Sequence, residues 1–293
     1  MKIIILFFVS VFLNVSCFCH EKTLCICAIF KNESRFLSEW IDYHLMVGVE
    51  EFYLYNNESQ DDYMKVLSPY INRGIVRLTQ WPSQEEGKDY ISYTFSTQIG
   101  AYNDCLKKKR GRSKWIAFID VDEFIVPVKE ESITEVLKKE FYDVSGLCIN
   151  WVIFGTSGVK EITKDELMIG KLTMRAPIES QRNLIFKCIV QPDHVESCAS
   201  PHWFVYKPRH WHVNTDRERV GNGQSDRLCI DKLRLNHYWT KDEKFFKEVK
   251  MPRYKEWNDS WKGIIEYKDS LNYEVDLSMI KFAEKLRAHR EKS

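Results

Sequence analysis

The stretch Trp115-Ile-Ala-Phe-Ile-Asp-Val-Asp-Glu-Phe-Ile-Val-Pro127 joins an apolar run to a group of acidic residues. Its first five residues have the length and the aromatic and branched composition of a buried strand. Asp120, Asp122 and Glu123 follow directly. Side chains two positions apart on an extended chain point to the same side, so Asp120 and Asp122 can converge on one point.

Two neighbouring carboxylates repel each other, and one tends to stay protonated unless a cation lies between them. A hard divalent ion such as Mg²⁺ or Mn²⁺, which prefers oxygen ligands, removes this conflict. Asp120 and Asp122 therefore predict a metal site at the end of the strand. The plainer interpretation is a solvated acidic turn, because the pattern Asp-x-Asp is common on its own.

Strand and helix patterns alternate on the N-terminal side of this stretch. Strand patterns occupy residues 23–30, 51–55 and 75–81, and helix patterns occupy residues 36–45, 61–70 and 90–106. Such alternation predicts an α/β fold with a mostly parallel central sheet, flanked by helices and joined by right-handed crossovers. In open α/β sheets, ligands bind beyond the carboxyl ends of the strands, where the polar loops of this sequence fall.

Polar side chains at that edge include Asn32 and Glu33 after the first strand, and Asn56 and Asn57 after the second. Together with Asp120 they predict a site of nucleotide size. Asn32 is also predicted to cap the helix that follows it. No Gly-x-Gly-x-x-Gly motif follows the first strand and no Walker A sequence occurs, so a dinucleotide-binding Rossmann enzyme is disfavoured.

The pattern beyond residue 127 is less regular. Helices are predicted at residues 132–142, 241–249 and 277–289, and strands at residues 146–154, 184–190 and 233–239. Four histidines, His194, His202, His210 and His212, fall within nineteen residues. They leave a zinc site open, but no pair has the i,i+4 spacing of a helical site, so ordinary polar packing is favoured.

The chain of 293 residues is 44% hydrophobic and 29% charged, which is typical of a globular protein with a substantial core. Its net charge of +1 offers no electrostatic basis for binding nucleic acid. Seven cysteines lie beyond residue 19, an odd number without a Cys-x-x-Cys pair. Most are expected to be small buried hydrophobic side chains, and one or two disulfides remain open.

Residues 1–19 have the pattern of a targeting segment. Lys2 precedes an apolar run that ends at the small residues Ser16 and Cys17. The apolar span covers about 16 positions, fewer than the roughly 20 that a transmembrane helix needs. A signal peptide is favoured over a short membrane anchor, and either predicts the secretory pathway, with an exported or membrane-associated protein. Residues 20–293 are predicted to form a single domain.

The sequence resembles glycosyltransferase family 92 and related family-2-like bacterial transferases in three stretches. These are residues 31–49, residues 98–124 with the central Asp120-Val-Asp-Glu-Phe124, and residues 235–245 with Leu235-Asn-His-Tyr238. The resemblance implies a GT-A fold, in which one α/β domain binds a nucleotide sugar and uses a divalent metal. It also implies an inverting transferase that moves a hexose from a UDP-sugar, with UDP-galactose as the donor in the best-known members.

The resemblance also implies roles for individual residues. Asp120 and Asp122 would bind the metal ion, Mn²⁺ or Mg²⁺, and His237 would complete the ligand set. The nucleotide sugar would contact Asn32, Glu33, Asn56, Asn57, Gln98, Asn103 and Asp120. Two positions depart from the family pattern, because Asn56 stands where relatives often have Asp, and Asp242 stands where they often have Ser.

Such a transferase needs a carboxylate that takes the proton from the acceptor hydroxyl. Asp193 and Glu123 are the candidates for this general base. The acceptor is expected to be a glycan or another glycoconjugate. Two other classes of protein remain open, a non-catalytic secreted carbohydrate-binding protein on the same fold and a metal-dependent phosphohydrolase.

Two further expectations concern particular side chains. Asn32 and Asn57 lie in N-glycosylation sequons, as does Asn258, but a glycan on either of the first two would block the expected nucleotide site. These two are therefore expected to be sequestered, unless the protein never meets the glycosylation machinery. Trp40 belongs to the apolar stripe of the first helix and is predicted to lie in the core.

Overall fold

The structure, a computed structural model, describes residues 22–82, 93–257 and 263–291. The predicted targeting segment, the sequon at Asn258 and most of the loop that begins at residue 82 lie outside these described residues. Within the described ranges, no helix is both long and apolar enough to cross a membrane.

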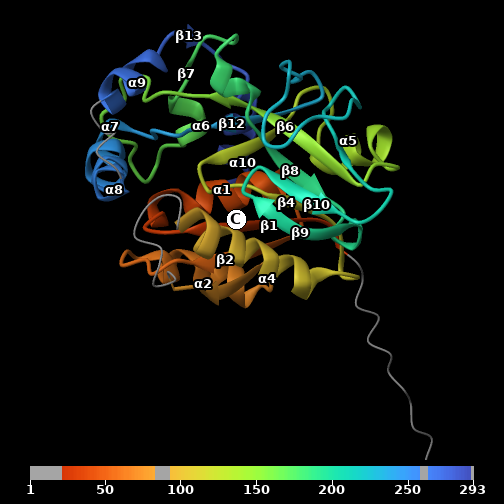
Figure 1. The fold of residues 1–293 in the computed structure, drawn as a ribbon. Helices are drawn as coiled ribbons and strands as arrows, with labels where there is room; N and C mark the ends of the chain where they lie inside the picture. Colours follow the sequence, from red (N-terminus) through yellow and green to blue (C-terminus); the bar gives the residue numbers. More distant parts are fainter. Residues whose placement is uncertain (1–21, 83–92, 258–262, 292–293) are drawn as a thin grey trace, which may run out of the picture.

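A nine-stranded sheet forms the centre of the molecule (Figure 1). Its strands follow the order β3 (Val76–Gln80), β2 (Glu51–Asn56), β1 (Lys22–Phe30), β4 (Ser113–Phe118), β8 (Phe186–Val190), β6 (Gly146–Ile153), β12 (Leu233–His237) and β5 (Glu123–Pro127), and β11 (His212–Val213) pairs with β6. The α/β class predicted from the sequence is therefore confirmed.

The sheet is parallel in its N-terminal part and mixed beyond it. Strands β3, β2, β1 and β4 are parallel to one another. Strand β8 runs antiparallel to both β4 and β6, whereas β12 is parallel to β6 and antiparallel to β5. The parallel arrangement expected from the alternating patterns therefore ends at β4, because β8 enters the sheet from the opposite direction.

Residues 115–127, which contain the acidic group Asp120, Asp122 and Glu123, connect two distant places in this sheet. Strand β4 ends at Phe118 and β5 begins at Glu123. Although the two strands are consecutive in the chain, β8, β6 and β12 lie between them in the sheet. Residues 119–122 therefore pass along the edge of the sheet formed by the strand ends, where Asp120 is partly exposed and the other three residues are buried.

Helices cover both faces of the sheet (Figure 1). The longer ones are α1 (Ser34–Met46), α2 (Tyr63–Asn72), α4 (Ile99–Lys109), α5 (Ile133–Glu140), α8 (Met251–Trp257), α9 (Ile264–Ser270) and α10 (Ile280–Arg290). Shorter pieces are α6 (Met168–Lys171), α7 (Glu243–Phe245), two π-helical turns η1 (Tyr93–Gln98) and η4 (Phe246–Lys250), and two 3₁₀ turns η2 (Gln181–Leu184) and η3 (Pro192–His194). The predicted helix at residues 241–249 thus begins later and continues as α7, η4 and α8.

Two two-stranded sheets lie outside the central one. They are the hairpin of β9 (Val195–Ser200) and β10 (Trp203–Tyr206), and the pair of β7 (Met174–Arg175) and β13 (Glu274–Val275). Alternate residues of β1 belong to two separate hydrophobic clusters, so the core has two parts on opposite faces of the sheet. The helices α1, α2 and α10 cover one part, and α4 with the β9–β10 hairpin covers the other.

Trp40 lies in the first part of the core and is fully buried, as predicted. Its indole nitrogen donates a hydrogen bond of 2.7 Å to the carbonyl oxygen of Glu123. The apolar stripe of α1 therefore supports the start of β5 directly. The predicted helix cap at Asn32 is wrong, because Asn32 has a left-handed backbone (φ 57°) and Glu33 occupies the N-cap position.

All seven cysteines of the described residues are buried and free, as expected for small hydrophobic side chains. The disulfides that the sequence left open are absent from this part of the chain.

Candidate active site

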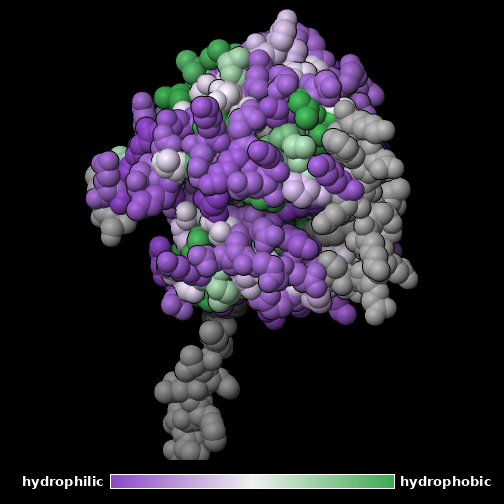
Figure 2. Space-filling view, turned by 90° about the vertical axis from the view of Figure 1, so that its left-hand side faces the viewer, coloured by the Kyte–Doolittle hydropathy of each residue, from purple (hydrophilic) through white to green (hydrophobic). Residues whose placement is uncertain are grey.

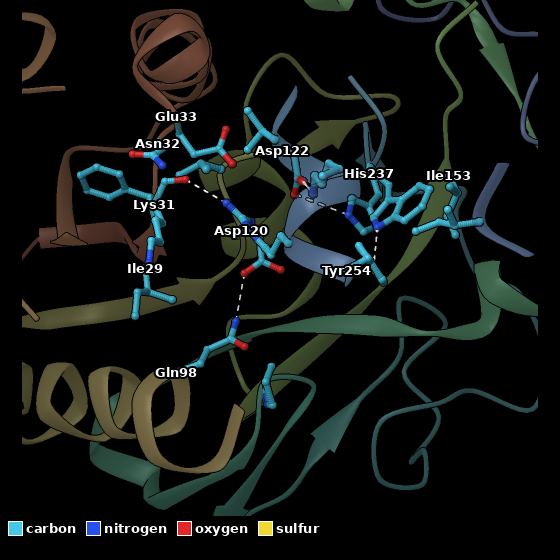
Figure 3. A pocket seen from close by; sticks show the side chains of 18 of the residues that line it. Ile29, Lys31, Asn32, Glu33, Gln98, Asp120, Asp122, Ile153, His237 and Tyr254 are labelled. Atoms are coloured by element: carbon cyan, nitrogen blue, oxygen red, sulfur yellow. Dashed lines mark hydrogen bonds and ion pairs between the residues drawn. The ribbon is translucent and has the colours of Figure 1, made fainter. Parts of the chain in front are cut away.

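A cleft of about 1170 Å³ opens beyond the carboxyl ends of β1, β4, β6 and β12 (Figure 3). Its polar lining includes Lys31, Asn32, Glu33, Asn57, Gln98, Asp120, Asp122, Arg182, Lys187, His202, His237, Glu248, Lys250 and Arg253. Its aromatic lining includes Phe30, Trp151, Trp239, Tyr254 and Tyr267. The face of the molecule in Figure 2 is mainly hydrophilic and is hollowed between its upper and lower parts.

Asp120 lies in the wall of the cleft with about a third of its side chain exposed (32%). One carboxylate oxygen accepts a hydrogen bond from the amide of Gln98 at 3.1 Å, and the other pairs with the Lys187 ammonium group at 2.9 Å. Lys187 is buried, and burial alone would lower its pKa. The nearby carboxylates of Asp120 and Glu123 outweigh burial and raise the pKa, so Lys187 carries its charge.

Asp122 is more deeply placed than Asp120. One oxygen pairs with the buried ammonium group of Lys250 at 2.8 Å, and the other lies 3.5 Å from Nε2 of His237. Burial alone would raise the pKa of Asp122, but Lys250 and His237 together hold that pKa well below its ordinary value. Asp122 is therefore ionised across the physiological pH range.

Glu123 holds the acidic turn together. Its carboxylate accepts a hydrogen bond of 2.8 Å from the backbone N–H of Asp120, and the side chain is fully buried beneath the cleft wall. Burial, reinforced by the neighbouring Asp120 and Asp122 charges, raises its pKa well above the ordinary value despite Lys187 at 3.9 Å. Because Glu123 does not line the cleft, it does not reach an acceptor there, which corrects the expectation of a general base.

His237 ends β12 and places its ring at the cleft wall beside Asp122. The ring packs against Trp151, with centroids 4.5 Å apart. Its Nδ1 has no hydrogen-bond partner among the described residues and lies 4.0 Å from the carboxylate of Glu123. The structure thus brings Asp120, Asp122 and His237 to one wall, as the sequence predicted.

The chemistry of these donors fits a divalent ion. Two carboxylates supply oxygen ligands, and a neutral imidazole nitrogen shifts the preference toward Mn²⁺ over Mg²⁺. In the structure, the carboxylates of Asp120 and Asp122 are each paired with a lysine ammonium group. An ion bound by these residues therefore competes with Lys187 and Lys250 for the same oxygens.

Two ion pairs join the first and the last of the three stretches that resemble the family. The ammonium group of Lys241 pairs with the Glu33 carboxylate, and both side chains are buried. Arg35 pairs with Asp242 at 2.6 Å. Burial lowers the pKa of Lys241, although Glu33 partly offsets this shift. These pairs fix the loop after β1 to the segment after β12, so both stretches form one cleft wall.

The two departures from the family pattern have structural roles. Asp242 caps α7 by accepting a hydrogen bond of 2.7 Å from Phe245 N, and it also accepts from the backbone N–H of Ile162 at 2.8 Å. Asn56 is buried, and its amide donates to Gln80 at 2.7 Å. Asn56 does not line the cleft, which corrects the expectation that it contacts the nucleotide.

Two further expectations are corrected. Asn103 points away from the cleft, because its side chain bonds both backbone groups of Cys198, accepting from N at 2.8 Å and donating to O at 3.1 Å. Asp193 lies in η3 outside the cleft wall, where its carboxylate accepts from Gly111 N at 3.0 Å. Asp193 is therefore not placed to act as a general base.

The remaining nucleotide-site residues of the sequence analysis do line the cleft. They are Asn32, Glu33, Asn57, Gln98 and Asp120. Asn57 is 1% exposed, and its amide nitrogen donates to the carbonyl of Trp81 at 3.0 Å. The nitrogen that would carry a glycan is thus buried in the folded chain, in line with the expected sequestration, while Asn32 is half-buried at the cleft wall.

The sequence did not predict that Lys187, Lys250 and most of the aromatic residues would line the cleft. Lys187 had a signal, because a charged residue in the middle of an apolar strand needs a buried partner. Lys250 and Trp239 had none, since their place at the cleft depends on how the C-terminal helices pack. The four histidines of the possible zinc site do not come together, because His202 lines the cleft and His194 stacks on His210 at 4.0 Å.

Comparison with known proteins identifies the class. The family model for glycosyltransferase family 92 matches residues 20–281, and the chain belongs to this family. The GT-A-type α/β fold expected from the resemblance agrees with the central sheet described above.

The individual relatives share between 24% and 34% sequence identity with this chain. A glycosyltransferase family 92 protein of Ricinus communis is 28% identical over 234 residues, which are 78% of this chain and 38% of that protein. The β-1,4-galactosyltransferase galt-1 of Caenorhabditis elegans is 24% identical, over 60% of this chain and 41% of the relative. The galactan β-1,4-galactosyltransferase GALS3 of Arabidopsis thaliana is 34% identical, over 38% of this chain and 22% of the relative. The chain therefore spans less than half the length of these curated relatives.

Likeness to solved structures is weak. The crystal structure of S. aureus TarS 1-349 in complex with UDP gives a TM-score of 0.37 at 11% identity, covering 66% of this chain and 60% of TarS. Glucosyl-3-phosphoglycerate synthase from Mycobacterium tuberculosis gives a TM-score of 0.33 at 12% identity, covering 59% of this chain and 58% of the synthase. Likeness at this level adds no support to any assignment.

Proposed function

We propose that this chain is a metal-dependent inverting glycosyltransferase that moves galactose from a UDP-sugar to a hydroxyl group of a glycan or glycoconjugate. Membership of family 92 supports the transferase class, and the similarity to the β-1,4-galactosyltransferases galt-1 and GALS3 favours galactose. The single observation that carries the proposal is the pair of carboxylates, Asp120 and Asp122, in the wall of a cleft at the ends of the parallel strands.

Transfer breaks the bond between the anomeric carbon and a diphosphate oxygen, so negative charge grows on the departing diphosphate. A divalent ion held by Asp120, Asp122 and His237 would neutralise part of that charge. Lys187 and Lys250 add two positive charges at the same wall. Preorganised cations aimed at developing charge lower the barrier because they need no reorientation during the reaction.

The aromatic lining offers a surface for the sugars. Trp239 lies at the centre of a group in which its indole N–H donates to the hydroxyl of Tyr254 at 3.2 Å. The ring of Tyr267 packs edge-on against Trp239, with centroids 5.1 Å apart. Aromatic faces bury the apolar face of a sugar ring while the hydroxyl groups stay solvated. We assign this group to the acceptor glycan, because it lines the cleft on the side of the C-terminal helices.

The general base of the proposed reaction is expected to be one of the carboxylates that line the cleft. Glu33, Asp120, Asp122 and Glu248 line it among the described residues. The first three each form an ion pair with a lysine. The side chain of Glu248 forms no hydrogen bond or ion pair within the described ranges, and it is exposed. We therefore propose Glu248 as the group that accepts the proton of the attacking hydroxyl.

Glu248→Gln tests this assignment. The kcat should fall by about 10²-fold or more, because the amide cannot accept the proton, while the affinity for Mn²⁺ and UDP stays the same. Glu284→Gln, at an exposed position on α10, is the matched control. An unchanged kcat in Glu248→Gln would remove this residue from the mechanism.

The function itself is tested by incubating the full chain with labelled UDP-galactose, Mn²⁺ and a panel of oligosaccharide acceptors. The expected result is a galactosylated acceptor whose new linkage has the β configuration by NMR, the inverse of the α-linked donor. Binding without turnover of any hexose donor would point instead to a non-catalytic carbohydrate-binding protein. Release of free phosphate without acceptor would point to a phosphohydrolase.

The same proposal covers the location of the protein. We propose that residues 1–19 direct the chain into the secretory pathway. Fusion of these residues to a reporter in a secreting cell should export or anchor it, and a reporter that stays in the cytosol would contradict this.

A further inference from the structure

Four polar groups meet in the part of the core beneath the β9–β10 hairpin, on elements that are far apart in sequence. Cys148 on β6 and Cys188 on β8 lie directly opposite each other, with their sulfur atoms 3.7 Å apart. A ring nitrogen of His212 on β11 lies within 4.8 Å of both sulfurs. We propose that Cys148, Cys188 and His212 bind a zinc-class transition metal ion in the core, at a site separate from the cleft.

The spacing of the sulfurs suits one tetrahedral ion. Two thiolates, each about 2.3 Å from zinc, lie roughly 3.8 Å apart at the tetrahedral angle. The Sγ atoms of Cys148 and Cys188 already have this separation, at 3.7 Å, before any ion is considered. A disulfide would need the same two atoms at about 2.05 Å, so the described geometry is that of two separate ligands.

His212 has the hydrogen bonding of a metal ligand. Its Nε2 faces the carbonyl oxygens of Val220 and Gly221, both at 3.3 Å, and therefore carries the ring proton. Nδ1 is then the nitrogen with the free lone pair, and it is buried without a hydrogen-bond partner among the described residues. A histidine that donates one ring N–H to a backbone carbonyl and keeps the other nitrogen bare is typical of metal sites. His212 itself is only 6% exposed.

Tyr206 is the fourth polar residue of the cluster. Its hydroxyl oxygen is also buried without a partner in the described part of the chain. That oxygen occupies the space of the missing side chain at Gly146, where a Cβ atom would lie 1.8 Å from it. Gly146 pairs with His212 across the sheet and lies two residues before Cys148, on the same face of β6. The Tyr206 hydroxyl thus lies against the strand that carries Cys148, and the Tyr206 ring lies beside that of His212, with centroids 5.5 Å apart.

The charge balance favours a buried ion of this kind. Binding of one Zn²⁺ to the two thiols releases two protons, one from Cys148 and one from Cys188, and the resulting site with neutral His212 has no net charge. The Cys188 thiol now donates toward the carbonyl of His202 at 3.3 Å, and this is the proton that binding would remove. A neutral site costs far less to bury than an isolated ion. Soft thiolate with imidazole selects zinc-class metals over Mg²⁺ or Mn²⁺.

The full chain, purified without chelator and with zinc in the growth medium, tests the proposal by elemental analysis. We expect one zinc ion per chain, and at least about tenfold less zinc in Cys148→Ser and Cys188→Ser. Cys25→Ser removes a buried thiol elsewhere in the same part of the core, and Asp122→Asn removes a ligand of the cleft. Both of these controls should keep their zinc.

Cobalt titration of the unaltered protein gives an answer even where a cysteine variant fails to fold. Co²⁺ bound by Cys148 and Cys188 gives a thiolate-to-cobalt charge-transfer band, which a carboxylate and histidine site in the cleft cannot produce. Absence of the band together with absence of zinc would overturn the proposal, as would full zinc retention in Cys148→Ser. A Cys148–Cys188 disulfide in the purified protein, found by mass spectrometry of alkylated peptides, would also overturn it.

Discussion

Two groups of polar side chains lie on opposite sides of strand β8 and differ in charge and in the kind of ligand atom that they offer. The cleft group, Asp120, Asp122, His237, Lys187 and Lys250, is charged, and each carboxylate has a lysine partner. The core group consists of Cys148, Cys188, His212 and Tyr206, and among the described residues no charged side chain lies within hydrogen-bond distance of it. Charged groups with exchangeable partners suit an anionic ligand that enters and leaves. Neutral soft donors suit one permanent ion.

Strand β8 carries a member of each group. Lys187 and Cys188 are neighbours in sequence, and successive side chains of a strand point to opposite faces of the sheet. Lys187 lines the cleft, and Cys188 faces the second part of the core. An ion bound on the core side would therefore stiffen the strand that positions a cation of the cleft.

The largest expected effect comes from the support beneath the cleft group. Trp40→Ala should lower the free energy of unfolding by roughly 3–5 kcal/mol, because it empties a fully buried site and removes the hydrogen bond to Glu123 O. Chemical denaturation measures this loss, and Trp211→Ala, at a half-exposed surface position, is the control. A variant of ordinary stability would mean that the acidic turn is held by β5 and β12 alone.

The next effect concerns the carboxylates. Asp122→Asn should lower kcat/KM by roughly 10²–10³-fold, because it removes a ligand and leaves the buried ammonium group of Lys250 without its counter-charge. Asp120→Asn should lose comparable activity but less stability, since Asp120 is a third exposed. Steady-state kinetics with Mn²⁺ and thermal unfolding measure the two losses. Equal destabilisation by both variants would contradict the deeper placement of Asp122.

His237→Ala should weaken Mn²⁺ affinity by roughly 10–100-fold, and excess Mn²⁺ should partly restore activity. The reason is that His237 adjoins Asp122 at the cleft wall and offers a ring nitrogen as a third ligand. Calorimetric titration of Mn²⁺ in the presence of UDP measures the affinity. His212→Ala is the matched histidine control from the core group, and it should leave Mn²⁺ affinity unchanged. The reverse pattern would exchange the roles of the two groups.

The smallest effect is a pH dependence at His202, which lies between the two groups. Burial, aided by the positive charge of Lys187, lowers its pKa to about 4 from an ordinary 6.5. The unfolded chain therefore takes up a proton first as the pH falls, and the stability that neutral His202 supplies above pH 6.5 is lost between pH 6.5 and about 4. His202→Gln should therefore remove a change of roughly 1–3 kcal/mol in the free energy of unfolding over that pH window.

Urea unfolding at stepped pH measures this change. His289→Gln, at an exposed position near the end of α10, should leave it in place. The same pH dependence of the free energy of unfolding in wild type and His202→Gln would show that other groups govern stability in this window.

The sequence predicted those features that local patterns encode. Strands β1, β2 and β4 follow from apolar runs of strand length and helix α1 from apolar residues at helical spacing, and the spacing of Asp120 and Asp122 alone placed two carboxylates together. The division of residues 115–127 into two strands at separate places in the sheet was not predictable, because β5 finds its partner more than one hundred residues later in β12.

The partners of the site residues could not be predicted from local patterns either, because they are far away in the sequence. Lys250 reaches Asp122 across a sequence separation of 128 residues. Cys148 and Cys188 are 40 residues apart, so no Cys-x-x-Cys spacing marks them. Asn103 matched the family pattern, but its amide satisfies the backbone of Cys198, and only the packing of the β9–β10 hairpin against α4 reveals this role.

The two ion pairs between the first and last stretches also bear on how the chain comes to be folded. Glu33 and Lys241 are 208 residues apart, and Arg35 and Asp242 are 207 apart. During synthesis the parallel strands can assemble from local crossovers as they emerge, but Glu33 and Arg35 lack these ion-pair partners until the segment after β12 has left the ribosome. A nascent chain that ends before Lys241 therefore lacks the contacts that join the two parts of the cleft wall, and the donor binding proposed above becomes possible only once the segment after β12 has been made.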